Sequence, residues 1–189
     1  MYYKNIEGHF NFEKVYDKVL SETQNGDILV EIGTYLGKST CYMAERVKEM
    51  GLKVVYHTID TFAPDPGMDM SRRRKRAIIA EGGDIYNSFL ENMRKANVLG
   101  LIIVHRMRST DAATLFADDS LSFVFIDGAH IYESVKEDIK VWYPKVKVGS
   151  LFGGHDYGNR IPTGVDRAVP ERFGSDFEVI ENSWIHRRK

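Results

Sequence analysis

The sequence is short of cysteine, with Cys41 the single example among 189 residues. One thiol cannot close a disulfide within the chain, which excludes the cross-linked scaffolds of small secreted domains and favours a reducing cytoplasm. Long hydrophobic runs are also missing: the apolar run 101–104 is too short to cross a bilayer, and residues 1–8 carry no apolar stretch typical of a signal peptide. We therefore expect a soluble, cytoplasmic protein that does not associate with membranes.

An excess of charge of either sign is absent as well. Lys and Arg number 26 against 27 Asp and Glu, so no overall field favours nucleic acid as a partner. The hydrophobic share of 43% is ordinary, and the length suits one compact domain over residues 1–189. The local exception is the basic run 72–76. It reads either as a solvated segment or as a site that recruits an anionic small-molecule substrate.

Short apolar runs alternate with helical stretches, a pattern typical of an α/β fold with a parallel sheet and crossover helices. The expected strands are 27–32, 53–59, 101–107, 121–126 and 149–154. The expected helices are 10–23, 38–50, 85–96, 110–116, 132–142 and 163–173. Residues 177–180 and 183–187 indicate a closing antiparallel hairpin. We predict a Rossmann-like, doubly wound, mainly parallel seven-stranded sheet whose ligand lies at the carboxyl ends of the strands, with 61–84 as a lid or substrate insertion there.

The loop 31–37, after the first expected strand, has the composition of a ligand-binding turn. Glycines such as Gly33 allow a tight turn and let a ligand approach the backbone N–H groups at a helix N-terminus. Tyr35 stands where the G-x-G-x-x-G fingerprint needs a glycine, which disfavours a nicotinamide dinucleotide. Glu31 can accept a hydrogen bond from a ligand ammonium group, and Asp60, after the second strand, can accept ribose hydroxyls.

The segment 31–39 resembles the S-adenosylmethionine (SAM) motif of catechol-type O-methyltransferases, an acidic-x-Gly-x-Tyr-x-Gly-x-Ser pattern. By this resemblance, Glu31 and Gly33 lie beside the methionine part, Ser39 meets its carboxylate, Asp60 holds the ribose and Ser109 lies near the adenine. The cofactor-binding residues expected in full are Glu31, Gly33, Tyr35, Ser39, Asp60, Ser109 and Asp127. The alternative interpretation of the loop is a structural strand-to-helix turn.

Acidic side chains and a histidine follow two further strands. Asp127 ends the fourth expected strand, and His155 and Asp156 end the fifth. A carboxylate that follows a buried strand is costly to bury without a partner, so it usually faces a ligand. Neighbouring strand ends of a parallel sheet meet, and we expect these three residues to form a divalent-metal site. The alternatives are a helix cap for Asp127 and a packed, hydrogen-bonded ring for His155.

The segments 126–132 and 149–157 resemble bacterial enzymes close to antibiotic-sugar O-methyltransferases, and the likeness extends over about 27–158. It implies methylation of a sugar-like or phenolic hydroxyl and a Mg²⁺ ion at Asp127, His155 and Asp156. Those relatives have Asp-Asp or Asp-Asn where this chain has His155-Asp156, and an imidazole suits Mn²⁺ better than Mg²⁺. His130 stands where catechol-type enzymes place a lysine base, and it can take a hydroxyl proton.

The sequence thus predicts a SAM-dependent methyltransferase that acts on a small-molecule hydroxyl, with Asp127, His130 and His155 as the catalytic residues. Two other functions stay open at this stage: a nicotinamide-dependent oxidoreductase, and a SAM-binding module without catalysis. The identity of the substrate does not follow, because the insertion 61–84 matches no pattern. In so short a chain, a homo-oligomer that completes the substrate pocket is a further expectation.

Overall fold

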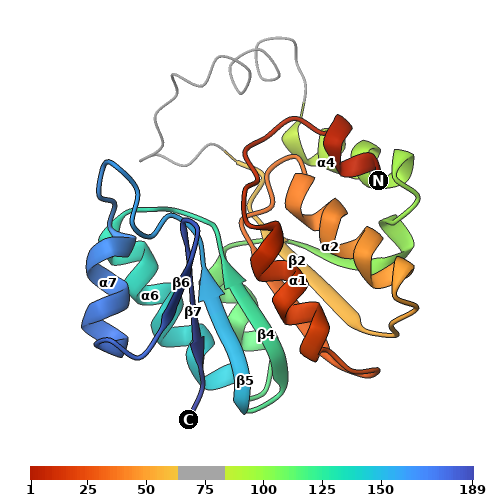
Figure 1. Ribbon diagram of the computed structural model, residues 1–189. Helices are drawn as coiled ribbons and strands as arrows, with labels where there is room; N and C mark the ends of the chain where they lie inside the picture. The colour runs from red at the N-terminus through yellow and green to blue at the C-terminus, as the bar shows by residue number, and fades with distance from the viewer. Residues whose placement is uncertain (64–83) are drawn as a thin grey trace.

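A computed structural model describes residues 1–63 and 84–189, and a single seven-stranded sheet forms its centre (Figure 1). The strands are β1 (Ile28–Ile32), β2 (Val55–Asp60), β3 (Ile102–Arg106), β4 (Leu121–Ile126), β5 (Val146–Gly154), β6 (Glu178–Ile180) and β7 (Ser183–Arg187). They lie in the order β3-β2-β1-β4-β5-β7-β6. The first five are parallel, and β7 runs antiparallel between β5 and β6. The predicted fold class and the closing hairpin are therefore confirmed.

Helices cover both faces of the sheet. They are α1 (Glu13–Glu22), α2 (Lys38–Glu49), α4 (Ile85–Lys95), α5 (Ser109–Ala112), α6 (Tyr132–Trp142) and α7 (Val165–Phe173). Short 3₁₀ turns are η1 (Tyr2–Asn5), η2 (Leu99–Leu101), η3 (Ala113–Leu115) and η4 (Tyr143–Lys145). The core is split by the sheet into two clusters: α1, α2 and α4 pack on one face, and α5, α6 and α7 pack on the other. The result is a three-layer α/β/α domain (Figure 1).

Strand β4 is the central strand that its nearly continuous apolar sequence predicts. It pairs with β1 on one side and with β5 on the other. Phe123 and Phe125 point into the cluster under α1 and α2, whereas Val124 and Ile126 point into the cluster under α6 and α7. Because side chains alternate along a strand, a strand covered on both faces needs apolar residues at every position, and this one has them.

The structure corrects the boundaries of several elements, including β5 and the helix expected over 110–116. Strand β5 begins at Val146, three residues before the predicted start at Gly149. Gly149 has a φ of 83° and lies inside the strand, where the register of pairing with β4 shifts; the glycine marks a bulge and not a start. The helix predicted over 110–116 is the short α5 followed by the 3₁₀ turn η3. Most of the predicted insertion, including the basic run 72–76, lies outside the described residues.

The carboxyl ends of β1, β2, β4 and β5 meet at one edge of the sheet. Ile32 pairs with Ile59 and with Ile126, which in turn pairs with Gly154. Three non-glycine residues that follow these strands have left-handed backbone: Tyr35 at φ 48°, Phe62 at φ 53° and Asp156 at φ 61°. Such strained residues cluster where a function requires the geometry, so this edge is the place to look for a site.

Among the helices of residues 1–63 and 84–189, none has the length and apolar character needed to cross a membrane.

Candidate active site

Glu31, predicted to meet a ligand ammonium group, forms the centre of a buried hydrogen-bond network. Its side chain is 1% exposed, and its carboxylate accepts hydrogen bonds from the hydroxyls of Tyr16, Thr40 and Tyr56. The hydroxyl of Ser39 is a further partner. Burial raises the pKa of Glu31, and these hydroxyl donors oppose that shift. The network ties α1, α2 and β2 to the base of the loop 31–37. Glu31 and Ser39 therefore support this loop, and the contacts predicted between these two residues and SAM stay predictions.

Asp60 holds the loop from the end of β2. Its Oδ2 accepts hydrogen bonds from the backbone N–H groups of Thr34 at 2.8 Å and Tyr35 at 2.9 Å. Its Oδ1 accepts from the N–H of Phe62 at 2.6 Å. A carboxylate has lone pairs for about four hydrogen bonds, so Asp60 keeps the capacity to accept from a ribose hydroxyl. Its predicted contact with the cofactor and its observed hold on the loop are compatible.

Gly33 brings the loop against the chain that follows β4. Its φ is 85°, and a Cβ built on it would lie 2.1 Å from the backbone oxygen of Asp127. The loop after β1 and the loop after β4 therefore approach each other closely through backbone atoms. This contact places the predicted cofactor loop directly beside Asp127, which follows β4.

Ser109 faces α6. Its Oγ accepts a hydrogen bond from Nε1 of Trp142 at 2.7 Å, and its hydroxyl is hydrogen-bonded to Asp138. Asp138 is buried, and burial, opposed by this hydrogen bond, raises its pKa from 3.8 to about 6. Ser109 thus links α5 to α6, and its predicted contact with adenine stays a prediction.

Asp138 makes the stability of the fold depend on pH. Because its pKa is higher in the folded chain, folding is favoured by protonation, and the free energy of unfolding falls as pH rises from about 4 through about 6. The expected loss is on the order of 3 kcal/mol, and an Asp138→Asn variant should not show it. Urea unfolding across this range, with the exposed Glu133→Gln as a matched control on α6, measures the difference. Wild-type and Asp138→Asn curves that run parallel with pH would contradict this prediction.

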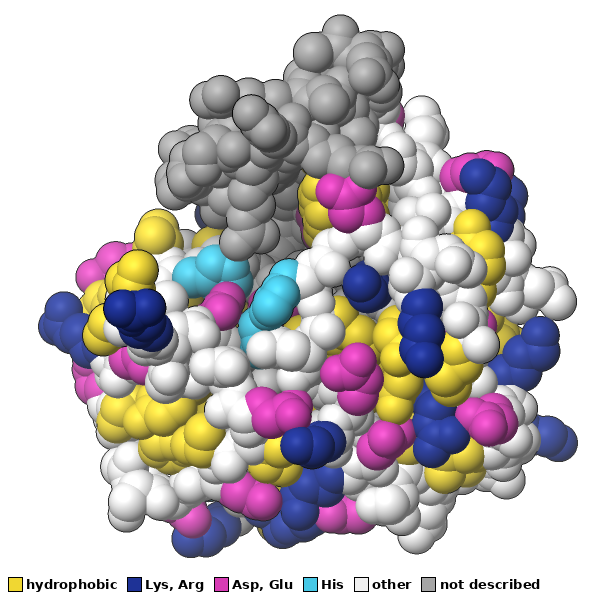
Figure 2. Space-filling view, turned by 45° about the horizontal axis from the view of Figure 1, so that its top comes forward, with side chains coloured by type: hydrophobic (Ala, Val, Ile, Leu, Met, Phe, Trp, Pro, Cys, Tyr) yellow, Lys and Arg dark blue, Asp and Glu magenta, His cyan; other side chains and the backbone are white. Residues whose placement is uncertain are grey.

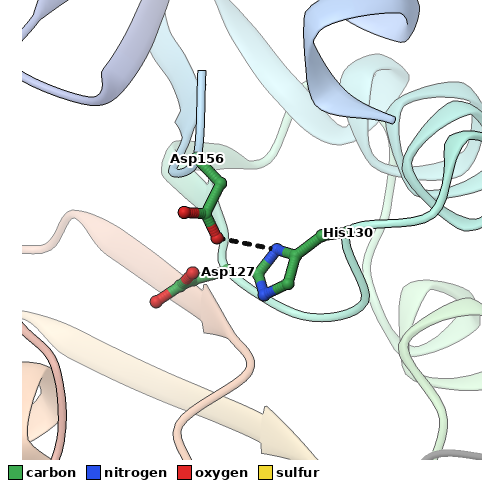
Figure 3. Close-up of side chains that lie close together, drawn as sticks. All are labelled: Asp127, His130 and Asp156. Atoms are coloured by element: carbon green, nitrogen blue, oxygen red, sulfur yellow. Dashed lines mark ion pairs between the residues drawn. The ribbon is translucent and has the colours of Figure 1, made fainter. Parts of the chain in front are cut away.

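Asp127, His130 and Asp156 converge at the same edge, from the loops after β4 and β5 (Figure 3). One ligand atom from each lies within 4.8 Å of the others. Nδ1 of His130 lies 2.9 Å from Oδ2 of Asp156. Burial would lower the pKa of His130, but the hydrogen bond and the charge of Asp156, with that of Asp127, raise it above its usual value. In the space-filling view, histidine side chains flank an acidic side chain at the surface (Figure 2).

His155 lies behind the two carboxylates. It is 5% exposed, and its Nδ1 lies 3.4 Å from Oδ1 of Asp127 and 3.6 Å from Oδ1 of Asp156. Burial would lower its pKa, but the two aspartates raise it to about 9. The structure therefore brings both His130 and the predicted His155 against the two aspartates, and the catalytic and metal-binding roles predicted for these residues stay predictions.

Asn11 is the residue that sequence reasoning missed. Its Oδ1 lies 2.8 Å from Nε2 of His155. In the sequence it stands between Phe10 and Phe12 and belongs to a stretch expected to be a cover helix. Helix α1 begins only at Glu13, so Asn11 is in the preceding loop. One polar residue among aromatic neighbours was the available signal.

The fold and this edge fit the class of SAM-dependent methyltransferases: the doubly wound sheet has the order 3-2-1-4-5-7-6, a glycine loop follows β1, and an acidic residue ends β2. The particular family follows from the sequence match. A family of methyltransferase domains matches residues 30–157, and the chain belongs to this family. The oxidoreductase alternative is thereby set aside.

Solved structures share the fold at low identity. The O-methyltransferase NovP has 23% identity and a TM-score of 0.69, over 95% of this chain and 78% of that one. CalS11, a TDP-rhamnose 3′-O-methyltransferase of calicheamicin biosynthesis, has 14% identity and a TM-score of 0.60, over 93% and 76%. A SAM-dependent O-methyltransferase from Thermotoga maritima has 11% identity and a TM-score of 0.59, over 90% and 53%. Among curated proteins, none matches the sequence.

The loop 33–37 and its surroundings fit SAM. Thr34 Oγ1 is buried in this loop without a hydrogen-bond partner among the described residues. A buried hydroxyl rarely stays unpaired, so a polar ligand group at the loop would satisfy it. Gly33 leaves no room for a side chain, and Asp60 retains acceptor capacity. Loop and carboxylate together offer donors and acceptors for the amino-acid and ribose parts of the cofactor.

Proposed function

We propose that the chain transfers a methyl group from SAM to a hydroxyl oxygen of a small molecule at the edge formed by Asp127, His130 and Asp156. The observation that carries the proposal is the pairing of His130 with Asp156 at 2.9 Å. This pair lies beside Asp127, whose backbone is in close contact with Gly33 of the predicted cofactor loop. NovP and CalS11, which share the fold, are both named O-methyltransferases, which supports oxygen as the acceptor atom, and the TDP-rhamnose in the name of CalS11 supports a sugar-like substrate. The phenolic alternative comes from the sequence resemblance to catechol-type enzymes.

His130 is the proton acceptor in this proposal. If Nδ1–H donates to Asp156, the neutral ring presents Nε2 as the acceptor for the proton of the substrate hydroxyl. Asp127 and Asp156 then stabilise the imidazolium that forms. When bound, SAM supplies an electrophilic methyl group and leaves as S-adenosylhomocysteine. The substrate oxygen gains the methyl group, and its proton ends on His130.

A divalent metal is the second version of the same proposal. Asp127, His130 and Asp156 offer two carboxylates and an imidazole within 4.8 Å, a donor set that suits Mn²⁺ better than Mg²⁺. A metal held there would lower the pKa of the accepting hydroxyl. A histidine nitrogen bound to a metal is not available to a proton, so the two versions give His130 different roles and respond differently to chelation.

Two cavities formed by the described residues lie away from this edge. One of about 770 Å³ lies among η1, α1 and α2, and one of about 220 Å³ lies at the amino ends of β4 and β5. We infer that the pocket for the acceptor involves the insertion predicted over 61–84. Its basic run would favour an anionic acceptor, and a homo-oligomer would supply further walls.

The test is the formation of S-adenosylhomocysteine from SAM over a panel of sugars, nucleotide sugars, phenols and matched amines, with EDTA and with added Mn²⁺. Turnover with hydroxyl acceptors and none with amines supports O-methylation. Turnover that survives EDTA supports His130 as the base, and a His130→Gln variant should then lose roughly 100- to 10,000-fold in kcat. Restoration by Mn²⁺ after EDTA supports the metal version. Methylation confined to the amines would overturn the proposal.

A further inference from the structure

Residues 8–12, here called the N-terminal strap, connect η1 to α1. They contact residues beside both halves of the site, which are the loop 31–37 and the group formed by Asp127, His130 and Asp156. The carbonyl oxygen of Gly8 accepts a hydrogen bond from Nζ of Lys38, beside the cofactor loop. Asn11 and Phe12 contact His155, beside the acidic residues. Figure 1 shows the strap between η1 and α1 passing over the edge where the strands end. The strap lies outside residues 30–157, the part that matches the methyltransferase family.

The contact between Asn11 and His155 determines which atom donates and which atom accepts the hydrogen bond. An amide oxygen only accepts hydrogen bonds, so Nε2 of His155 must carry a hydrogen to bond to it at 2.8 Å. With Nε2 held there, Nδ1 on the other side of the ring faces Oδ1 of Asp127 and of Asp156. A half-turn of the ring about its Cβ–Cγ bond would present a carbon to these carboxylates. Asn11 therefore selects the orientation in which a nitrogen faces them.

The two aspartates contact Nδ1, and Asn11 is the polar side chain described at the opposite end of the ring, at Nε2. The backbone N–H of His155 bonds to the carbonyl oxygen of Ile126, which places the main chain but not the ring. The ring centroid of Phe12 lies 4.8 Å away and packs against the imidazole without offering a hydrogen-bond acceptor. At 5% exposure, water has little access to replace the amide.

We propose that Asn11 is a positioning residue for methyl transfer: it orients His155, and His155 in turn holds Asp127 and Asp156 on their inner oxygens so that both carboxylates face His130. The proposal rests on the proposed function for its effect on rate, but its effect on the ring of His155 is independent of any reaction. Outer partners of this kind change activity by roughly 10- to 100-fold when they are removed.

The first experiment reads the ring directly. In the full-length chain with ¹⁵N-labelled histidine, long-range ¹H–¹⁵N spectra of the wild type should show a hydrogen on Nε2 of His155 that exchanges slowly. An Asn11→Asp variant keeps an acceptor oxygen and should keep this signal, whereas Asn11→Leu, similar in size but without an acceptor, should lose it. The exposed Asn5→Leu serves as the matched control. An unchanged His155 signal in Asn11→Leu overturns the proposal, whether or not the protein methylates any acceptor.

The second experiment tests the route through His155. Asn11→Leu should lower kcat by roughly 10- to 100-fold with little change in KM for SAM, and Asn11→Asp should restore most of the rate. In a His155→Gln background, Asn11→Leu should have no further effect. Equal losses from Asn11→Leu in both backgrounds would show that Asn11 acts by some other route, and that result also overturns the proposal.

Discussion

Asp127→Asn should lower kcat for methyl transfer by roughly 100- to 10,000-fold while the fold stays close to that of the wild type. The side chain keeps its size, so the loop contact with Gly33, which involves only the backbone oxygen of Asp127, is undisturbed. What disappears is a negative charge beside two imidazoles. Nδ1 of His155 lies 3.4 Å from Asp127, and the charge of Asp127 also raises the pKa of His130.

Both versions of the reaction require this charge. Without a metal, it stabilises the imidazolium that forms on His130; with a metal, it is one of two carboxylate ligands. S-adenosylhomocysteine formation gives kcat, calorimetric titration gives SAM affinity, and thermal unfolding shows that the variant is folded. The exposed Asp111→Asn makes the same chemical change outside the cluster and should behave as the wild type. A folded Asp127→Asn variant that keeps most of its activity would show that the reaction occurs elsewhere on the protein.

The fold could be predicted from the sequence because its signals are local and repeated. Strand β4 is apolar at nearly every position, and α6 ends just before Pro144, as the spacing predicts. The boundary error at β5 came from Gly149, since a glycine with positive φ breaks the local pattern whether it begins a strand or bulges one. The residues 64–83 matched no pattern and lie outside the described part of the chain.

The site was predicted in outline, since residues that end parallel strands must meet at one edge. Asp127, His155 and Asp156 lie side by side as this reasoning expects, and their roles stay predictions. The burial of His155 and the partial exposure of His130 could not be predicted, because they depend on which ring packs beneath the carboxylates. Asn11 and His155 are 144 positions apart in the sequence, and no local pattern predicts a contact over that separation. The network around Glu31 was missed for the same reason, as its donors come from three separate elements.

Gly33→Ala should destabilise the fold and weaken SAM binding together, because this glycine is where the two halves of the site touch. A Cβ at this position would lie 2.1 Å from the backbone oxygen of Asp127 and 2.7 Å from the backbone nitrogen of Gly128. Backbone atoms at the end of a central strand cannot move aside as a flexible side chain can. The expected loss is roughly 2 to 6 kcal/mol, the sum of left-handed strain and overpacking.

Gly26→Ala separates these two causes. Gly26 has a φ of 91°, close to the 85° of Gly33, but a Cβ there would meet nothing within 4 Å. It should therefore cost only the strain, roughly 1 to 3 kcal/mol, and leave SAM affinity unchanged. For Gly33→Ala, a shift of the loop by about 1 Å is enough to reduce cofactor-dependent turnover on the order of 100-fold. Chemical unfolding and SAM titration of both variants decide the matter. If the two variants lose equal stability and bind SAM equally well, the loop after β1 is not the cofactor loop. If only Gly33→Ala loses SAM affinity, the backbone contact at Gly33 joins the cofactor loop to the residues Asp127, His130 and Asp156.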